Sequence, residues 1–316
     1  MKEVQTLIAN EMLALEAQIR TLIPKDDHLL QQVAHHTFQS PGKQLRPTLV
    51  LLAAGACKNI TAKALRGAVL VTLLHQASLT HDDVVDEATQ RRGKPSINAV
   101  WNNKIAVLFG DYLLATGLQL ATQHQDYDFL ALIAETAQAM SVGELRQLAQ
   151  TDTCDTTESI YLDIIYKKTA HLFGTCLAAG AMAAGVSAAQ VANMRRVGEQ
   201  IGMAFQLKDD WLDYGIENLG KPLGMDLQGR KLTLPLIHAL QQASAQQQRE
   251  ILNNLKNLQN HPQQQEAILT FVRQSPGMDY TQKTMLRYQQ KALELLSYTA
   301  TSPYQKALLL LIQHIV

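Results

Sequence analysis

The sequence contains one acidic motif twice, and both copies look suited to holding cations. Asp82–Asp86 and Asp209–Asp213 each read D-D-x-x-D, and an apolar run precedes each. If both motifs are helical, the first and last aspartates of each lie one turn apart on one helix face. Two carboxylates ~4 Å apart repel by about 4 kcal/mol at an effective dielectric of 20, so we expect cations between them. Oxygen ligands suit Mg²⁺, which binds carboxylates together with phosphate oxygens. The motifs therefore predict an enzyme that handles a diphosphate.

Basic residues stand where they could bind phosphate oxygens. The run Arg91–Pro95 follows the first motif and contains two arginines, which can make bidentate hydrogen bonds to an oxyanion. Lys43 and Arg46 lie three residues apart beside a predicted helix start. Lys168 interrupts an apolar helical pattern. Taken singly, each of these residues could equally be a solvated surface charge.

Helical periodicity dominates the chain and predicts a single all-α domain spanning residues 1–316. A helix over residues 62–87 would carry the first motif at its C-terminal end. His75 would lie on that helix two turns before the motif, although a lone histidine could also be a core residue. The polar, basic segment 89–95 is predicted as a loop. Two further helix starts are marked by residue pairs with capping-box spacing, Asp155 with Glu158 and Ser187 with Gln190. The helix that begins at the second pair would carry the second motif.

Composition narrows the class of protein. The 316 residues are 47% hydrophobic and 18% charged, which is enough apolar material for a sizeable core. The 28 basic and 28 acidic residues balance, which argues against a general nucleic-acid surface. Three scattered cysteines (Cys57, Cys154 and Cys176) predict free thiols in a reducing compartment. Neither a signal peptide nor a continuous membrane-spanning run stands out, so we expect a cytoplasmic protein without membrane insertion.

Together and in order, the motifs resemble those of the trans-prenyltransferases, or polyprenyl diphosphate synthases, essentially from end to end. The family's G-G-K-R-L-R-P segment is similar to Pro41–Pro47, and its first aspartate-rich motif with an R-R-G-K-P tail is similar to Asp82–Pro95. Its G-D-Y/F-L element is similar to Gly110–Leu113, and its K-T pair is similar to Lys168-Thr169. Its F-Q-x-x-D-D-x-x-D, G-K-x-x-x-D and K-L-T-L-P elements are similar to Phe205–Asp213, Gly220–Asp226 and Lys231–Pro235. Two residues depart from the pattern: Pro41 replaces a Gly, and Gln44 replaces an Arg. The second change removes a cation and implies greater reliance on Lys43 and Arg46.

The resemblance implies an isoprenoid synthase-like bundle of long helices around a deep central cleft, usually homodimeric. It implies three Mg²⁺ ions per active site, ligated by Asp82, Asp86 and Asp209, with Asp83, Asp210 and Asp213 completing the acidic rims. It assigns Arg91, Lys168 and Lys221 to the allylic diphosphate, and Lys43, Arg46, His75 and Arg92 to isopentenyl diphosphate. Lys231 is a further substrate-binding candidate, and Gln206 and Thr169 would lie near the forming cation.

The implied reaction is sequential head-to-tail (1'-4) condensation of isopentenyl diphosphate onto an allylic diphosphate. Metals and cationic side chains would stabilise the departing diphosphate, and no protein nucleophile is required. In the family, bulky residues four and five positions before the first aspartate stop chain growth early. The small residues Ser78 and Ala77 stand there. We therefore expect a medium- or long-chain product of about six to nine isoprene units, each adding roughly 3–4 kcal/mol of apolar burial at ~0.8 kcal/mol per CH₂.

Other functions remain open at this point. The nearest alternative is a short-chain farnesyl or geranylgeranyl diphosphate synthase. A terpene cyclase is a second alternative, but it would not need the basic residues of an isopentenyl site. A non-catalytic synthase subunit is a third, but such subunits typically lose their acidic motifs, and both motifs are complete here. A carboxylate di-iron bundle would want Glu-x-x-His repeats, which the sequence does not contain.

Overall fold

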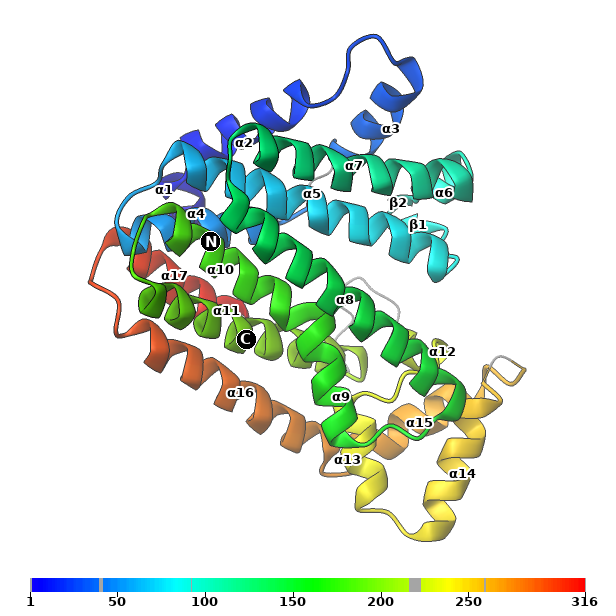
Figure 1. The fold of residues 1–316 in the computed structure, drawn as a ribbon. Coiled ribbons are helices and arrows are strands. Elements are labelled where there is room, and N and C mark those ends of the chain that lie inside the picture. Colours follow the sequence, from blue (N-terminus) through cyan, green and yellow to red (C-terminus); the bar gives the residue numbers. More distant parts are fainter. Residues whose placement is uncertain (1, 40–41, 92, 216–222, 259, 316) are drawn as a thin grey trace. The chain divides into compact units, whose positions relative to one another are not determined.

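The computed structural model describes residues 2–39, 42–91, 93–215, 223–258 and 260–315, and most of these residues are helical (Figure 1). The first helices are α1 (Lys2–Leu7), α2 (Ala9–Thr21), α3 (His28–Phe38), α4 (Leu45–Cys57), α5 (Ala62–Val85), α6 (Ile97–Val100) and α7 (Asn103–Gln123). There follow α8 (Tyr127–Thr153), α9 (Glu158–Ile165), a π-helical turn η1 (Tyr166–Ala170), α10 (His171–Ala183), α11 (Ala188–Asp213) and α12 (Met225–Gln228). The last are α13 (Leu234–Gln241), α14 (Ala245–Lys256), α15 (Gln264–Arg273), α16 (Gly277–Leu296) and α17 (Pro303–Ile315). Two short strands, β1 (Gln90–Arg91) and β2 (Lys94–Pro95), form the described sheet, and the predicted all-α fold is confirmed.

The residue contacts divide the chain into two compact units, each assembled from several stretches. The first comprises Met1–Ala137, Thr175–Arg195 and Tyr298–Leu311. The second comprises Gln138–Gly174, Arg196–Ser297 and Ile312–Val316. The first acidic motif belongs to the first unit and the second motif to the second. The single domain expected for residues 1–316 stays a prediction.

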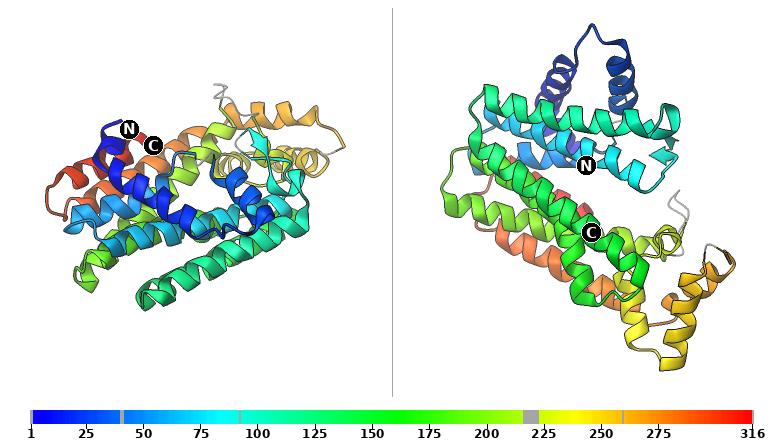
Figure 2. Two further views of the ribbon diagram at one scale, coloured as in Figure 1. Left: turned by 90° about the horizontal axis from the view of Figure 1, so that it is seen from above. Right: turned by 45° about the vertical axis from the view of Figure 1, so that its right-hand side comes forward.

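Helix α5 is the centre of the first unit. It packs along α7 and α4, and Figures 1 and 2 show α5 and α7 side by side and antiparallel. Thr61 caps its start by accepting a hydrogen bond from the backbone N of Ala64 at 3.1 Å. Arg66 fixes the same end through an ion pair of 2.6 Å with the buried carboxylate of Asp126. The helix ends two residues earlier than expected, because Glu87 adopts a left-handed backbone with φ of 50°.

Glycines in α7 allow this close packing. A Cβ atom on Gly110 would lie 2.2 Å from Nε2 of His81 in α5. Two residues later, the hydroxyl of Tyr112 donates a hydrogen bond to the carbonyl oxygen of Leu22, 2.7 Å away, beyond the end of α2. Leu113 is fully buried. The element Gly110–Leu113 therefore holds α7 against both α5 and α2.

The outer side of α7 is less covered. By length and composition α7 could cross a membrane, with a mean hydropathy of 1.4, yet 44% of that segment is buried within the fold. Its exposed large apolar side chains are Val107, Leu108 and Leu118.

The second unit has its own core, contributed mainly by α9, α11, α13 and α15. Leu207, Tyr214 and Leu234 are fully buried in it. Helix α11 approaches the start of α10 closely, because a Cβ on Gly198 would lie 2.3 Å from the carbonyl oxygen of Phe173. In Figure 1, α13 is seen near α16, against which it packs. The second acidic motif thus lies on a helix that is rigidly held.

The two predicted capping boxes had different outcomes. Ser187 and Gln190 bond reciprocally, at 3.1 and 3.4 Å, and α11 begins at the next residue, as predicted. The box expected from Asp155 with Glu158 is wrong. Thr157 caps α9 instead, because its hydroxyl accepts from the backbone N of Ile160 at 3.3 Å. Cys57, Cys154 and Cys176 are free thiols, as predicted.

We expect Gly110→Ala to lower the free energy of unfolding by about 1–3 kcal/mol, because the added methyl group meets the His81 ring. Urea unfolding measures this. Gly117→Ala on the same helix is the control, since its Cβ would lie 3.4 Å from Leu70, an ordinary contact. Adding His81→Ala to Gly110→Ala should restore part of the loss, and no restoration would contradict the proposed cause.

Candidate active site

The first acidic motif lies at the C-terminal end of α5, and its aspartates differ in exposure. Asp82 is half-buried, Asp83 is buried and Asp86 is exposed. Asp86 is the C-cap of the helix and donates its backbone N–H to the carbonyl oxygen of Asp82 at 2.8 Å. Asp83 instead accepts hydrogen bonds from Nε and Nη2 of Arg91, at 2.8 and 2.5 Å. The middle aspartate is therefore an internal ion-pair partner, while Asp82 and Asp86 retain access to solvent.

The segment after the motif is a small hairpin rather than the predicted loop. Strands β1 and β2 pair antiparallel, and Gly93 turns the chain with a φ of 74°. Asn98 holds the hairpin to the helix end, because its side-chain amide donates to the carbonyl oxygens of Asp83 and Ala88, at 3.3 and 3.0 Å. This arrangement presents Arg91 to Asp83. Arg92 lies outside the described residues.

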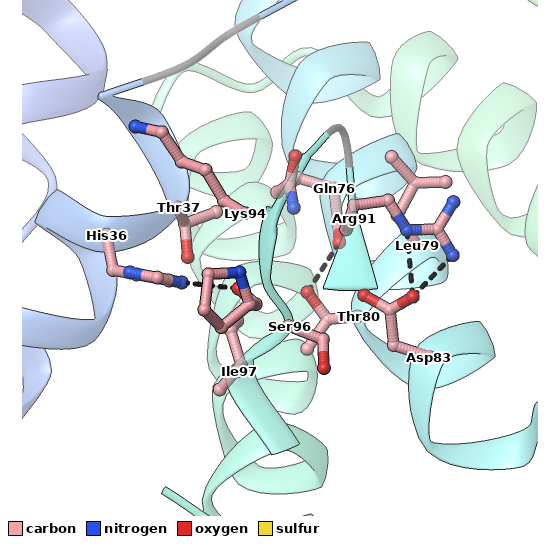
Figure 3. A pocket seen from close by; sticks show the side chains of 11 residues that line it. His36, Thr37, Gln76, Leu79, Thr80, Asp83, Arg91, Lys94, Ser96 and Ile97 are labelled. Carbon is pink, nitrogen blue, oxygen red and sulfur yellow. Dashed lines mark hydrogen bonds and ion pairs between the residues drawn. The ribbon is translucent and has the colours of Figure 1, made fainter. Parts of the chain in front are cut away.

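A small pocket lies behind the motif, between α3, α5 and the hairpin (Figure 3). Gln76, Thr80 and Asp83 line it from one face of α5. His36 closes its rim through a contact of 2.8 Å between Nε2 and the carbonyl oxygen of Pro95. Its volume is about 50 Å³, which suits a few water molecules but not a diphosphate. We therefore regard this pocket as a packing feature beside Arg91 and not as a substrate site.

Other candidates of the first unit lie on α4 and α5. Lys43 is exposed and Arg46 is half-buried in the first turn of α4. Between them Gln44, the departure from the family pattern, has a left-handed backbone with φ of 45° and donates to Oε1 of Glu16 at 3.3 Å. Its side chain thus contacts α2. His75 is half-buried on α5.

The two chain-length candidates also lie on α5. Ala77 is fully buried and Ser78 is half-buried. Ser78 and Asp82 are four residues apart, so they share one face of the helix. This face is opposite to the one on which Gln76, Thr80 and Asp83 line the pocket.

The second motif occupies the last turns of α11. Asp209 is exposed, whereas Asp210 is buried and both of its oxygens accept hydrogen bonds. The hydroxyl of Tyr161 donates to Oδ2 at 2.5 Å, and Nε2 of Gln206 donates to Oδ1 at 2.7 Å. Oε1 of Gln206 in turn accepts from the hydroxyl of Thr169 at 2.8 Å. The structure thus joins Gln206 and Thr169, two predicted site residues, in one network with Asp210.

Asp213 fastens the motif to the segment that follows it. Its carboxylate accepts from the backbone N atoms of Met225 and Asp226, both at 3.0 Å. Burial raises the pKa of Asp213. Burial also raises the pKa of Asp226 to about 6; Lys231 opposes the rise, and Asp213 and Asp209 add to it. Asp226 was missing from the predicted site residues, although it ends the motif element Gly220–Asp226.

Lys168 is held by two residues that no motif indicated. Its Nζ lies 2.5 Å from Oε2 of Glu144 and donates to Oε1 of Gln147 at 3.2 Å. Helix α8 approaches the turn η1 closely enough that a Cβ on Gly143 would lie 2.8 Å from the backbone N of Lys168. Single π-helical turns inside α-helices are frequent at functional sites. Lys231 is half-buried beside Asp226, and Lys221 lies outside the described residues.

The donor set fits a hard divalent cation. In both motifs the candidate ligands are carboxylate oxygens, which Mg²⁺ prefers. Burial and the neighbouring charge of Asp226 raise the pKa of Asp210. Within the described ranges, no three His, Cys, Asp or Glu side chains already converge on one point.

Comparison with known proteins identifies the family. The polyprenyl synthetase family model matches residues 27–272. The all-trans-nonaprenyl-diphosphate synthase (geranyl-diphosphate specific) of Rhodobacter capsulatus is 36% identical over 304 residues, which is 95% of this chain and 93% of that protein. A decaprenyl diphosphate synthase structure from Rhodobacter capsulatus has a TM-score of 0.94 at 32% identity, covering 99% of this chain and 98% of that one. A polyprenyl synthase from Caulobacter crescentus, complexed with calcium and isoprenyl diphosphate, has a TM-score of 0.92 at 30% identity, covering 99% and 96%.

The chain therefore belongs to the polyprenyl synthetase family. Within that family it is a trans-prenyltransferase of the medium- to long-chain type. The resemblance read from the motifs and the preference over a short-chain synthase are both confirmed.

The raised pKa of Asp226 predicts how stability depends on pH. Between about pH 4 and pH 6 the folded protein holds more protons than the unfolded chain, so stability is lost as the pH rises through about 6. We expect the metal-free protein to be less stable at about pH 7.5 than at about pH 5, with Asp226 contributing about 1 kcal/mol. Urea unfolding at the two pH values measures the difference. Asp226→Asn should reduce it, and an unchanged difference would exclude Asp226 as the cause.

Proposed function

We propose that this prenyltransferase acts alone, without a second type of subunit, as an Mg²⁺-dependent synthase that condenses isopentenyl diphosphate head-to-tail onto an allylic diphosphate. The observation that carries this proposal is the completeness of both acidic motifs. In each, the first aspartate is at least partly exposed to solvent, while the second is buried and internally bonded. The Caulobacter crescentus relative, which is complexed with calcium and isoprenyl diphosphate, supports a divalent cation and a prenyl diphosphate ligand.

Asp82, Asp86 and Asp209 would hold the metal, with three Mg²⁺ ions in the complete site. When bound, Mg²⁺ neutralises the negative charge of the diphosphate oxygens. The other three aspartates complete the acidic rims mainly as anchors. Asp83 binds Arg91, Asp210 binds Tyr161 and Gln206, and Asp213 binds the start of α12.

Cationic side chains bind the two substrates. Arg91, Lys168 and Lys221 take the allylic diphosphate. Two of them are pre-oriented: Arg91 by Asp83, and Lys168 by Glu144 and Gln147. Lys43, Arg46, His75 and Arg92 take isopentenyl diphosphate, and Lys231 adds positive charge beside Asp226.

The chain's own groups then guide the reaction. The C1–O bond of the allylic substrate breaks, and the electron pair leaves with pyrophosphate. The double bond of isopentenyl diphosphate attacks C1, and loss of a proton to the released pyrophosphate gives the extended allylic product. Gln206 and Thr169 lie beside the forming cation, where Oε1 of Gln206 offers partial negative charge.

Product length follows from the space available to the growing chain. The two Rhodobacter capsulatus relatives are a nonaprenyl and a decaprenyl diphosphate synthase. Small residues before Asp82 permit growth along α5, so we propose a product of about six to nine units, each contributing roughly 3–4 kcal/mol of apolar burial.

The protein is proposed to be a soluble, cytoplasmic homodimer. Val107, Leu108 and Leu118 expose apolar surface along α7, and a second copy of the chain would cover it. One side of α7 is already buried in the first unit. This distribution suits an interface helix better than a membrane span.

The purified protein, incubated alone with Mg²⁺, farnesyl diphosphate and labelled isopentenyl diphosphate, should make linear polyprenyl diphosphates. Asp82→Ala and Asp209→Ala should each lower turnover by a factor of about 10² or more, since charge stabilisation in the transition state is lost. Chromatography of the labelled products measures both results. Cyclic products would support a terpene cyclase, and activity that requires a second protein would support a synthase subunit.

Asp279→Ala is the control for that experiment, because Asp279 is an exposed aspartate in the first turn of α16. It should leave turnover unchanged. Circular dichroism of all three variants checks that they are folded. Near-normal rates in Asp82→Ala or Asp209→Ala would contradict the metal assignment.

Ser78→Phe should shorten the product by filling space on the Asp82 face of α5. Reverse-phase chromatography of the hydrolysed products measures the shift. Ala77→Phe is a less suitable test, because Ala77 is fully buried and a larger side chain there would also overpack the core. An unchanged product from Ser78→Phe would show that the chain grows along another path.

A further inference from the structure

Tyr161 is a buried tyrosine that the proposed reaction does not use. It lies in α9, its side chain is almost fully buried, and its hydroxyl donates to Oδ2 of Asp210 at 2.5 Å. This separation lies at the short end of the range for O–H···O hydrogen bonds in proteins. Asp210 itself is 3% exposed, so this carboxylate is held inside the second unit.

The same carboxylate determines the orientation of the Gln206 amide. Of the two ends of the amide only the NH₂ group is a donor, and it is the NH₂ group of Gln206 that faces the Asp210 carboxyl group. The observed contact of 2.7 Å from Nε2 to Oδ1 of Asp210 has this orientation. Oε1 of Gln206 consequently points away from Asp210 and accepts from the hydroxyl of Thr169 at 2.8 Å.

Four groups from three elements thus form one chain of hydrogen bonds. Tyr161 comes from α9, Thr169 from η1, and Gln206 and Asp210 from successive turns of α11. If the donor of Tyr161 were lost, Asp210 would keep one partner, and its carboxylate could rotate. The Gln206 amide would then lose its fixed direction.

We propose that Tyr161 and Asp210 are positioning residues, which hold the carbonyl oxygen of Gln206 in the direction needed during condensation. This proposal rests on the proposed function, in which Gln206 and Thr169 lie beside the reacting carbon. It assigns to the second aspartate of the second motif an anchoring role and not that of a metal ligand. Tyr161 acts through Gln206 and does not touch substrate.

The principal test is a double-mutant cycle on the turnover number. Tyr161→Phe removes the hydroxyl alone and should lower kcat about tenfold, with KM for both substrates changed less than about twofold. In a Gln206→Leu background the same substitution should change kcat by less than about twofold, since the group that Tyr161 positions is gone. Equal losses in both backgrounds would show a general structural role and overturn the proposal.

Tyr280→Phe is the matched control. The Tyr280 hydroxyl also donates to a carboxylate of the second unit, Oε1 of Glu158, at 2.7 Å. It should leave kcat unchanged, which shows that losing a tyrosine–carboxylate bond is not harmful by itself.

A second measurement separates anchor from ligand without relying on turnover. The melting temperature is recorded with and without Mg²⁺ plus inorganic pyrophosphate. Asp210→Asn should keep most of the rise in melting temperature that these additives cause, whereas Asp209→Asn should lose it. Equal loss in both variants would make Asp210 a ligand and overturn the proposal. This readout remains usable if Tyr161→Phe fails to fold. A wild type that binds Mg²⁺ and pyrophosphate but makes no polyprenyl product would contradict the proposed function instead.

Discussion

The buried second aspartate of each acidic motif is the constraint on which the rest of the site depends. An isolated carboxylate inside a protein is strongly unfavourable, so each needs partners. Asp83 forms an ion pair with the guanidinium of Arg91, whereas Asp210 is hydrogen-bonded by the uncharged donors of Tyr161 and Gln206. The two aspartates therefore have partners of different charge. Because the partners of Asp210 are neutral, burial raises the pKa of its carboxyl group. In both motifs the anchored residue orients the helix end, so that its neighbour remains accessible.

Close backbone approach gives these anchors their rigidity. In the first unit, Gly110 lets the ring of His81 lie against α7. In the second, Gly143 brings α8 onto the backbone of Lys168, and Gly202 brings α11 to within 2.5 Å of Ala170 Cα, as measured from the position of an added Cβ. Packed interiors resist small displacements. The charged groups are therefore carried on elements that cannot easily shift, which preorganised electrostatic stabilisation requires.

Much of this could be predicted from the sequence, and the failures have physical causes. Helical periodicity and the Ser187 cap identified α11 correctly, because both signals are local. The end of α5 was misplaced, since Glu87 takes a left-handed conformation that is uncommon for its residue type. Glu144 and Tyr161 were missed because their partners, Lys168 and Asp210, lie 24 and 49 positions away, and only tertiary packing brings them together. The metal-binding roles of the aspartates stay predictions.

The π-helical turn Tyr166–Ala170 places two residues of the proposed site, Lys168 and Thr169, in an irregular stretch of helix. Such a turn contains one residue more than the α-helix around it, and it widens the local spiral. Deleting one residue from this stretch would give a more regular α-helix. Every side chain after the deletion would, however, be rotated by roughly 100° about the helix axis. Lys168 and Thr169 could then no longer both keep their present neighbours. A change of length in this stretch would therefore disturb the proposed site, even though the helix itself would become more regular.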